Sequence, residues 1–241
     1  MKVQRYPLSL LSESSRRKSD RRIAWLAKLL RPTKPILRVC STLYGHIEFL
    51  QWLEGWGPSR KFSGYKHFPT REELWSFIIE QSRLREIGHV IEFGVANGDG
   101  TRFWLANLDD ICYHGFDCFT GMPDNYRQVP RGVFDLEGSP PQISDSRVAW
   151  HIGLIEETLD GFKMPTNRPK LVLFDLDLYS PTLFALSRVV PYLRHSDIVF
   201  FDESWDDAEG VVARDFFAKC TELRLIASAT GCMALEFVGG R

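Results

Sequence analysis

The segment Lys-Leu-Val-Leu-Phe-Asp-Leu-Asp, residues 170–177, constrains the fold more than any other part of the sequence. Its apolar run is typical of a strand buried on both faces, in the middle of a parallel sheet. Asp175 and Asp177 follow at positions i and i+2, so in an extended chain both side chains point to the same face. Open α/β sheets bind ligands at the carboxyl ends of their strands, and adjacent carboxylates need a cation or a proton to offset their repulsion. The segment therefore predicts a functional site at the end of a buried strand.

A second apolar run, residues 197–203, also ends on two acids, Asp202 and Glu203. If the two strands are neighbours, Asp175, Asp202 and Glu203 surround one hard divalent ion, and Asp177 is left to act as a base. Mg²⁺ suits such a site because it prefers oxygen ligands and retains water molecules that a substrate displaces. The alternative is that these acids cap the helices that follow, since carboxylates are favoured at helix N-termini.

The composition indicates one globular domain plus an extension. The chain has 241 residues, 44% of them hydrophobic, and no apolar segment approaches the roughly 18–20 residues of a membrane-spanning helix. The five cysteines are odd in number, scattered and never in a CxxC pair, which argues against a disulfide framework or a zinc site. We therefore expect a reducing compartment, the cytoplasm.

Charge is distributed unevenly along the chain. Residues 1–40 contain eleven Lys and Arg against two acids, a net charge of +9, and the remaining residues contain 19 against 29, a net of −10. Within this basic N-terminal arm, residues 23–30 are a candidate amphipathic helix. We expect the arm to pack on the protein itself or on a second subunit of a homo-oligomer, with an anionic membrane surface as the alternative. The acidic body disfavours nucleic acid as a partner.

From residue 70 onward, strands and helices alternate. Residues 70–73 have the form of a capping box and predict the start of a helix. Strands are expected at residues 89–95, 112–117, 148–152, 170–175 and 198–202, and helices at residues 101–108, 182–193 and 211–220. Two last strands, residues 223–229 and 232–238, are expected to form a hairpin that adds an antiparallel edge. The pattern predicts an α/β fold: a Rossmann-like, mostly parallel, doubly wound sheet with a C-terminal antiparallel hairpin.

The connection formed by residues 119–146 is too long and too rich in Gly and Pro for an ordinary loop. Because it follows a strand at the ligand end of the sheet, we expect it to act as a lid. Phe119, Tyr126 and Phe134 are candidates to close over a substrate, and the alternative is that they pack on the body of the domain.

A glycine loop, Glu-Phe-Gly-Val-Ala-Asn-Gly-Asp-Gly at residues 92–100, lies between the first of these strands and its helix. Its glycines let the backbone approach a ligand, and the helix start offers unpaired N–H groups. The dinucleotide pattern GxGxxG fails because Phe103 stands at its last glycine, and a Walker loop would need Gly-Lys-Ser/Thr. An acid one strand later holds ribose hydroxyls in Rossmann-like folds. The candidate cofactor-binding residues are Glu92, Gly94, Ala96, Gly98 and Asp117.

Together these segments resemble a known enzyme family. The glycine loop, with Ala96 at the middle glycine, is similar to motif I of class I S-adenosylmethionine-dependent methyltransferases. Joined with residues 115–123, 175–182 and 202–203, it resembles the macrocin O-methyltransferase (TylF/MycF/NovP-like) family over residues 68–238. The resemblance implies a methyltransferase domain, residues 41–241, that transfers a methyl group from S-adenosylmethionine to a hydroxyl, commonly on a sugar of a natural product, with help from Mg²⁺.

The resemblance also implies residue roles. Asp175, Asp202 and Glu203 match the metal ligands, although the family usually has Asp-Asp at residues 202–203, and Asp177 matches the base. A cation beside the acceptor hydroxyl lowers the pKa of that hydroxyl, so that a carboxylate can take its proton. Two alternatives stay open: a metal-independent small-molecule methyltransferase, and a non-catalytic binding protein on the same fold. Two histidines, His151 and His195, are alternative bases, although a lone histidine is more often structural.

Overall fold

The computed structural model of the protein describes residues 47, 49–52, 65–126, 129–205, 208–229 and 231–240. The chain divides into two units, Met1–Gly45 and His46–Arg241, and all the described residues belong to the second. The basic arm and its candidate helix at residues 23–30 lie outside the described residues. In the described part of the chain, no helix is long and apolar enough to cross a membrane, and the four cysteines are free thiols.

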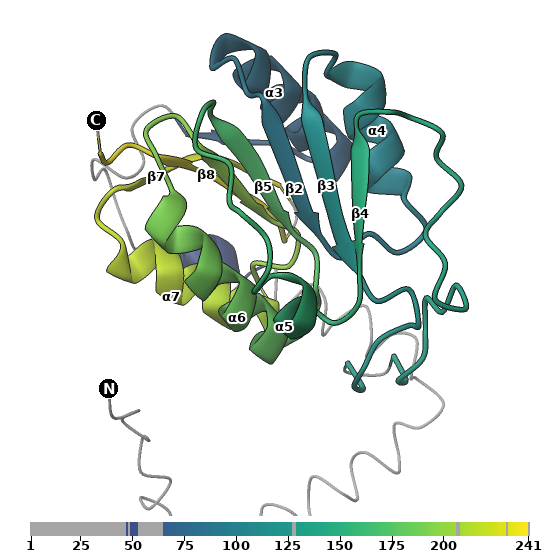
Figure 1. Cartoon of the computed structure of the whole chain (residues 1–241). Helices are drawn as coiled ribbons and strands as arrows, with labels where there is room; N and C mark the ends of the chain where they lie inside the picture. Colours follow the sequence, from purple (N-terminus) through teal and green to yellow (C-terminus); the bar gives the residue numbers. More distant parts are fainter. Residues whose placement is uncertain are drawn as a thin grey trace, which may run out of the picture. The chain divides into compact units, whose positions relative to one another are not determined.

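One eight-stranded sheet forms the centre of the second unit (Figure 1). Its strands lie in the order β1-β7-β8-β6-β5-β2-β3-β4, and every neighbouring pair is parallel except the two pairs that β8 makes. This confirms the predicted fold class. The strand bounds are β1 (Lys66–His67), β2 (His89–Phe93), β3 (Cys112–Asp117), β4 (Val148–Ile152), β5 (Lys170–Phe174), β6 (Ile198–Phe201), β7 (Leu223–Ser228) and β8 (Met233–Phe237).

The predicted C-terminal hairpin is present, but its antiparallel strand does not form the edge of the sheet. β8 pairs with β6 on one side and with β7 on the other, and β1 pairs with β7 beyond them. The strand position between β6 and β7 is therefore occupied by β8, which follows both of them in the sequence. The short strand β1 then covers the side of β7 that would otherwise be an edge.

Helices cover both faces of the sheet, α3 and α4 on one face and α5, α6 and α7 on the other (Figure 1). The strand β5 shows the reason, because all of its residues are buried. Leu171 and Leu173 pack in the core beneath α3 and α4, whereas Val172 and Phe174 pack in the core beneath α6 and α7. The helix bounds are α3 (Arg71–Leu84), α4 (Asp99–Asn107), α5 (Ile155–Thr158), α6 (Tyr179–Val189) and α7 (Glu209–Lys219).

Two helix starts show how local sequence sets these bounds. α3 begins where the capping box predicts, and the Thr70 hydroxyl accepts a hydrogen bond from the Glu73 backbone N–H. α6 begins at Tyr179, three residues earlier than expected, and so contains Pro181 in its first turn. Proline is tolerated there because that N–H has no partner within the helix in any case. A 3₁₀ turn, Val190–Tyr192, continues α6 to the end of the predicted helix.

Candidate active site

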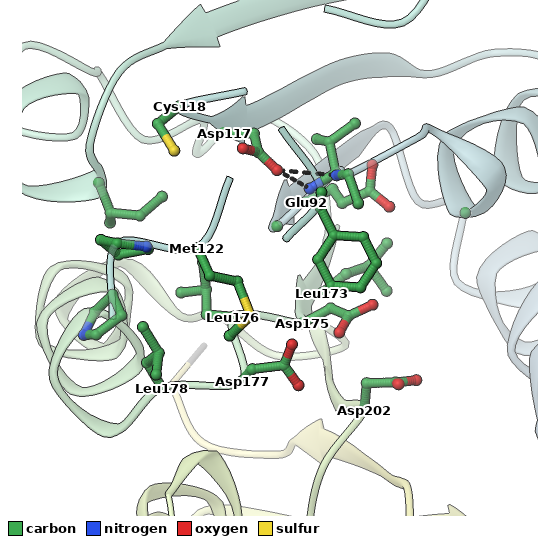
Figure 2. Close-up of a pocket in the computed structure, with 18 of the residues that line it drawn as sticks. Glu92, Asp117, Cys118, Met122, Leu173, Asp175, Leu176, Asp177, Leu178 and Asp202 are labelled. Carbon is green, nitrogen blue, oxygen red and sulfur yellow. Dashed lines mark hydrogen bonds between the residues drawn. The ribbon is translucent and has the colours of Figure 1, made fainter. Parts of the chain in front are cut away.

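A cavity of about 700 Å³ lies at the carboxyl ends of the central strands. The glycine loop, part of the 119–146 loop and the acids that follow β5 and β6 all line it. Figure 2 shows Glu92 and Asp117 at one end, and the carboxylates of Asp175, Asp177 and Asp202 grouped at the other. Of the residues predicted for the site, the cavity is lined by Glu92, Gly94, Ala96, Asp117, Asp175, Asp177, Asp202 and Glu203.

The glycine loop requires glycine because neighbouring protein atoms leave no room for a Cβ. Gly94 has a φ of 87°, and a Cβ there would lie 1.8 Å from the backbone oxygen of Asp175. Gly98 has a φ of 77°, and its open side faces Pro141 of the 119–146 loop, where a Cβ would lie 2.8 Å from the proline ring. Gly98 is therefore a packing position behind the cavity wall and not a lining residue, contrary to the close-approach argument.

Glu92 acts as a buried brace beneath the glycine loop. Its Oε2 accepts hydrogen bonds from the Thr101 hydroxyl of α4 (2.5 Å) and the Tyr113 hydroxyl of β3 (2.8 Å). Burial raises the pKa of Glu92 to about 7, against the lowering effect of these two donors. A Cβ at Gly100 would lie 2.7 Å from Glu92 Oε1, so that glycine makes room for the carboxylate. The predicted cofactor residue thus also joins β2, β3 and α4.

Asp117 holds the glycine loop through its backbone. The carboxylate oxygen Oδ2 accepts hydrogen bonds from the N–H groups of Val95 and Ala96, both at 2.9 Å, and Oδ1 accepts one from Phe119 N–H at 2.8 Å. The two bonds to the glycine loop are drawn in Figure 2. Because a carboxylate can accept about four hydrogen bonds, Asp117 retains capacity for a hydroxyl in the cavity.

The two acids after β5 share the cavity, but the reason differs from the one predicted. The strand ends at Phe174, so the alternation of a strand does not reach Asp177. Asp177 has a φ of 60°, the left-handed conformation that a non-glycine residue rarely adopts. A tight turn and not an extended chain therefore brings Asp175 and Asp177 to one cavity. Such strained residues concentrate at functional sites.

The acid cluster, defined here as Asp175, Asp177, Asp202 and Glu209, is electrostatically unfavourable. The Asp175 side chain lines the cavity and is exposed. Desolvation by the surrounding protein, followed by repulsion from Asp202, Glu209 and Asp177, raises the pKa of Asp175 well above its usual value. A group of carboxylates with such strongly raised pKa values is a candidate catalytic site.

Glu209 is a site residue that the sequence did not reveal. It is fully buried at the start of α7, and burial raises the pKa of its carboxyl well above the usual value. Its carboxylate accepts hydrogen bonds from the N–H groups of Leu176 (2.8 Å), Asp177 (3.2 Å) and Glu203 (3.3 Å). One side chain thus ties the loop after β5 to the loop after β6. An acid in a first helical turn is common, so its position gave no signal.

Arg71 is the second residue that sequence reasoning missed. Its Nη1 lies 2.7 Å from Asp202 Oδ2, and its guanidinium carbon lies 4.9 Å from the ring centroid of Trp75. In the described part of the chain, no group of three or more His, Cys, Asp or Glu side chains is arranged to hold a metal ion. With Arg71 on Asp202, the predicted Mg²⁺ ligands Asp175, Asp202 and Glu203 do not fit a metal in this conformation.

The 119–146 loop folds back on itself beside the cavity. Backbone hydrogen bonds join Met122 N–H to Val133 oxygen and Leu136 N–H to Phe119 oxygen, both at 2.9 Å. Phe119 is completely buried and its ring packs edge-on against Trp150, so it is a core residue and not part of a lid. Phe134, by contrast, is exposed and lines the cavity.

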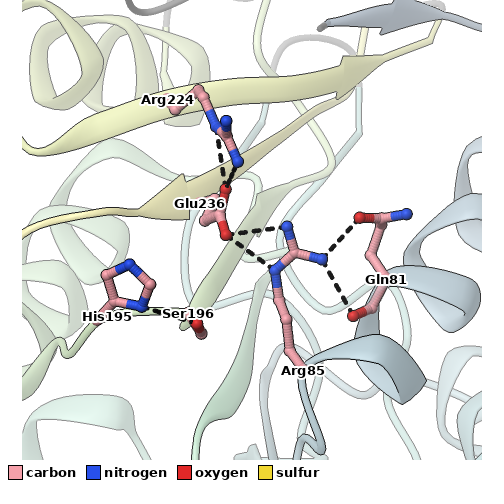
Figure 3. Close-up of polar contacts among 6 residues, drawn as sticks. All are labelled: Gln81, Arg85, His195, Ser196, Arg224 and Glu236. Carbon is pink, nitrogen blue, oxygen red and sulfur yellow. Dashed lines mark hydrogen bonds and ion pairs between the residues drawn. The ribbon is translucent and has the colours of Figure 1, made fainter.

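The two histidines weighed as alternative bases lie away from the cavity. His151 lies on β4 and is half-buried; its ring stacks on Phe116 with the ring centroids 4.1 Å apart, and burial lowers its pKa. His195 precedes β6 at the amino end of the sheet, where its Nδ1 lies 2.9 Å from the Ser196 hydroxyl (Figure 3). Neither residue is among the described residues that line the cavity.

Comparison with solved structures supports the fold. No protein-family model matches the chain, and no curated protein matches it in sequence. The O-methyltransferase NovP is 17% identical, with a TM-score of 0.55 over 70% of this chain and 80% of that one. The calicheamicin methyltransferase CalS11 is 22% identical (TM-score 0.49, 69% and 80% covered), and TomG of Streptomyces achromogenes, an O-methyltransferase solved with S-adenosylmethionine, is 14% identical (0.45, 70% and 82%). The likeness to NovP shows that this chain shares the Rossmann-like fold of that O-methyltransferase.

Proposed function

We propose that this protein is an S-adenosylmethionine-dependent O-methyltransferase that acts on a hydroxyl group of a small molecule. The main observation in support is the continuity of one cavity from the glycine loop to the acid cluster. A cofactor at the first end and an acceptor at the second would lie within reach of each other, which methyl transfer requires. The resemblance to the macrocin O-methyltransferase family makes a sugar or a natural-product glycoside the proposed acceptor.

Asp117 and the start of α4 are the proposed cofactor contacts. Asp117 would bind the ribose hydroxyls with the acceptor capacity that its three backbone bonds leave, while Glu92 braces the loop from below. Bound S-adenosylmethionine supplies a methyl group on a positively charged sulfur. The same position of the acid in other Rossmann-like folds supports this orientation.

Asp177 is the proposed base. The acceptor hydroxyl would give its proton to the Asp177 carboxylate as the oxygen forms a bond to the methyl carbon and the carbon–sulfur bond breaks. The products are the methyl ether, S-adenosylhomocysteine and a protonated Asp177. Glu209 would act as a positioning residue, because it holds the backbone N–H of Asp177 and so fixes the turn that aims this carboxylate.

Mg²⁺ assistance through Asp175, Asp202 and Glu203 stays a prediction. The contact between Arg71 and Asp202 favours the other alternative from the sequence, a metal-independent methyltransferase. Activity measured with EDTA and with added Mg²⁺ separates the two.

The cofactor assignment is tested by calorimetry. We expect saturable binding of S-adenosylmethionine and S-adenosylhomocysteine, and about tenfold weaker binding in Asp117→Asn, which loses acceptor capacity toward the ribose. Asp110→Asn is the matched control, because Asp110 is an exposed surface partner of Arg168. Absence of binding, or a preference for NAD, would contradict the proposal.

Association of the chain with partners is also a prediction. Residues 1–40 are proposed to mediate self-association or contact with an anionic membrane surface, in a cytoplasmic homo-oligomer that does not bind nucleic acid. Deletion of residues 1–31 should leave cofactor affinity unchanged, because every proposed cofactor contact lies after residue 90. A membrane effect should weaken as salt concentration rises.

A further inference from the structure

Arg71 places a permanent positive charge inside the acid cluster. It is the first residue of α3, and its guanidinium reaches the carboxylate of Asp202, a residue 131 positions later in the chain. The ring of Trp75, one helical turn away, supports the guanidinium from its face. Among the described residues that line the cavity, Arg71 is the only Lys or Arg.

Both oxygens of Asp202 are already engaged by protein atoms. Oδ2 accepts the hydrogen bond from Arg71 at 2.7 Å, and the Cys232 thiol lies 3.7 Å from Oδ1. The Asp202 side chain is only 10% exposed. A divalent ion that used this carboxylate would have to displace the guanidinium or remain beside it against the repulsion of two like charges.

The Arg71 side chain nevertheless lines the cavity, and 43% of it is exposed. A guanidinium has five N–H donors, and the bond to Asp202 uses one of them. Arg71 lines the same cavity as Asp177, the proposed base, so the remaining donors are available to an acceptor oxygen that loses its proton there. Fixed donors at such a point stabilise the transition state most strongly.

We propose that Arg71 is the resident cation of the acid cluster: it holds Asp202 and supplies the positive charge beside the acceptor oxygen, so that methyl transfer needs no divalent ion there. This inference rests on the proposed function for its catalytic half. Its structural half, exclusion of a metal by Arg71, does not depend on any methyl transfer.

The first experiment is a Mn²⁺ titration followed by electron paramagnetic resonance, with Mn²⁺ as a probe for a hard divalent ion. The full-length protein should show no saturation up to about 1 mM Mn²⁺. Arg71→Gln should bind Mn²⁺ at least about tenfold more tightly, because removal of the guanidinium frees the Asp202 carboxylate and removes the positive charge that repels the ion. Arg71→Lys, which keeps the charge, should exclude the ion as the wild type does.

Arg188→Gln is the matched control. Arg188 also has an aspartate partner, Asp160 at 2.6 Å, and an aromatic neighbour, Phe184 with its ring centroid at 5.0 Å, but it lies on the surface of α6. This variant should not gain Mn²⁺ binding, and the double variant Arg71→Gln with Asp202→Asn should lose what Arg71→Gln gained. Saturable Mn²⁺ binding by the wild type in the micromolar range, or no gain in folded Arg71→Gln, overturns the inference.

The second experiment separates this inference from the proposed function. S-adenosylmethionine affinity is measured by calorimetry on the same samples and should be equal in the wild type and Arg71→Gln. If none of the samples binds S-adenosylmethionine, the proposed function fails while the Mn²⁺ result still judges the structural half. If all bind it and methyl transfer by the wild type is abolished by EDTA and restored by Mg²⁺, the function stands and Arg71 is not the resident cation.

Discussion

The two ends of the sheet both hold buried carboxylates, but they differ in how positive charge is matched to them. At the amino end, Glu236 of β8 is paired with Arg85 and with Arg224 (Figure 3). Beside it, Lys170 and Asp197 form an ion pair with no exposed surface on either side chain. Every carboxylate named here has at least one cation in direct contact.

At the carboxyl end, Arg71 is the only Lys or Arg among the described residues that line the cavity with Asp175, Asp177 and Asp202. Arg71 contacts Asp202, and burial, followed by repulsion from Asp202, Glu209 and Asp177, raises the pKa of Asp175 well above its usual value. Buried ion pairs that are complete serve structure, because removal of one partner leaves an uncompensated charge. A group of carboxylates that repel one another is unfavourable for stability and is retained where charge changes during a reaction. This difference between the two ends supports the proposal that the carboxyl end of the sheet is the functional one.

The largest effect is expected from breaking the amino end. Lys170→Met should lower the free energy of unfolding by about 3–5 kcal/mol, because it leaves Asp197 buried without its cation. The measurement is chemical denaturation. Lys219→Met is the control, since Lys219 and Asp215 form an exposed pair that solvent screens, so its loss should change the free energy of unfolding little. Equal losses in the two variants would show that the buried pair is not stabilising.

The next effect tests positioning at the carboxyl end. Glu209→Gln should reduce turnover by about 10²-fold, because an amide cannot accept the hydrogen bonds of Leu176, Asp177 and Glu203 in the same way. Affinity for S-adenosylmethionine, whose proposed contacts lie at the other end of the cavity, should stay within about twofold. A uniform loss of folding stability with turnover unchanged would make Glu209 a structural residue only.

An Asp→Asn substitution is expected to change the free energy of unfolding less, and in opposite directions at the two ends of the sheet. Asp175→Asn should raise the free energy of unfolding, because it removes repulsion from three neighbouring carboxylates. Asp197→Asn at the amino end should lower it by about 3 kcal/mol, because Lys170 loses its partner. If both variants are destabilised alike, the proposed difference in charge balance between the two ends is wrong.

The smallest expected effect concerns His114, a histidine of β3 that lies apart from the two carboxylate groups compared above. His114 lies close to His151, with ring nitrogens 3.3 Å apart, and burial followed by repulsion from His151 and His89 lowers the pKa of His114 to about 4. Since the unfolded chain binds this proton near pH 6.5, its contribution to stability is complete above that pH and falls as pH drops toward 4. Ring titration by NMR should give a midpoint near 4, and His114→Gln should reduce the loss of stability below pH 6.5. A midpoint near 6.5 would contradict the expected effect of burial.

Several parts of the fold and the site followed from the sequence. The alternation of apolar runs with amphipathic segments located β2 to β8 and the helices α3, α4, α6 and α7, although not β1 or α5, and the acids after residues 174 and 201 marked the end of the sheet where the cavity lies. The glycine loop was located by residue type. Its geometry was not, because the reasons for Gly94 and Gly98 are the Asp175 backbone and Pro141, which no local pattern indicates.

The sequence alone determined the order of most elements and their approximate positions, because periodicity, capping and turn preferences are local properties of the chain. Tertiary structure decided which side chains meet at those ends. Arg71 reaches Asp202 across 131 residues, Glu209 joins two loops from the next helix, and β8 enters the sheet between strands formed before it. These outcomes depend on packing and charge between distant segments, whose free energies exist only once the sheet has brought the segments together.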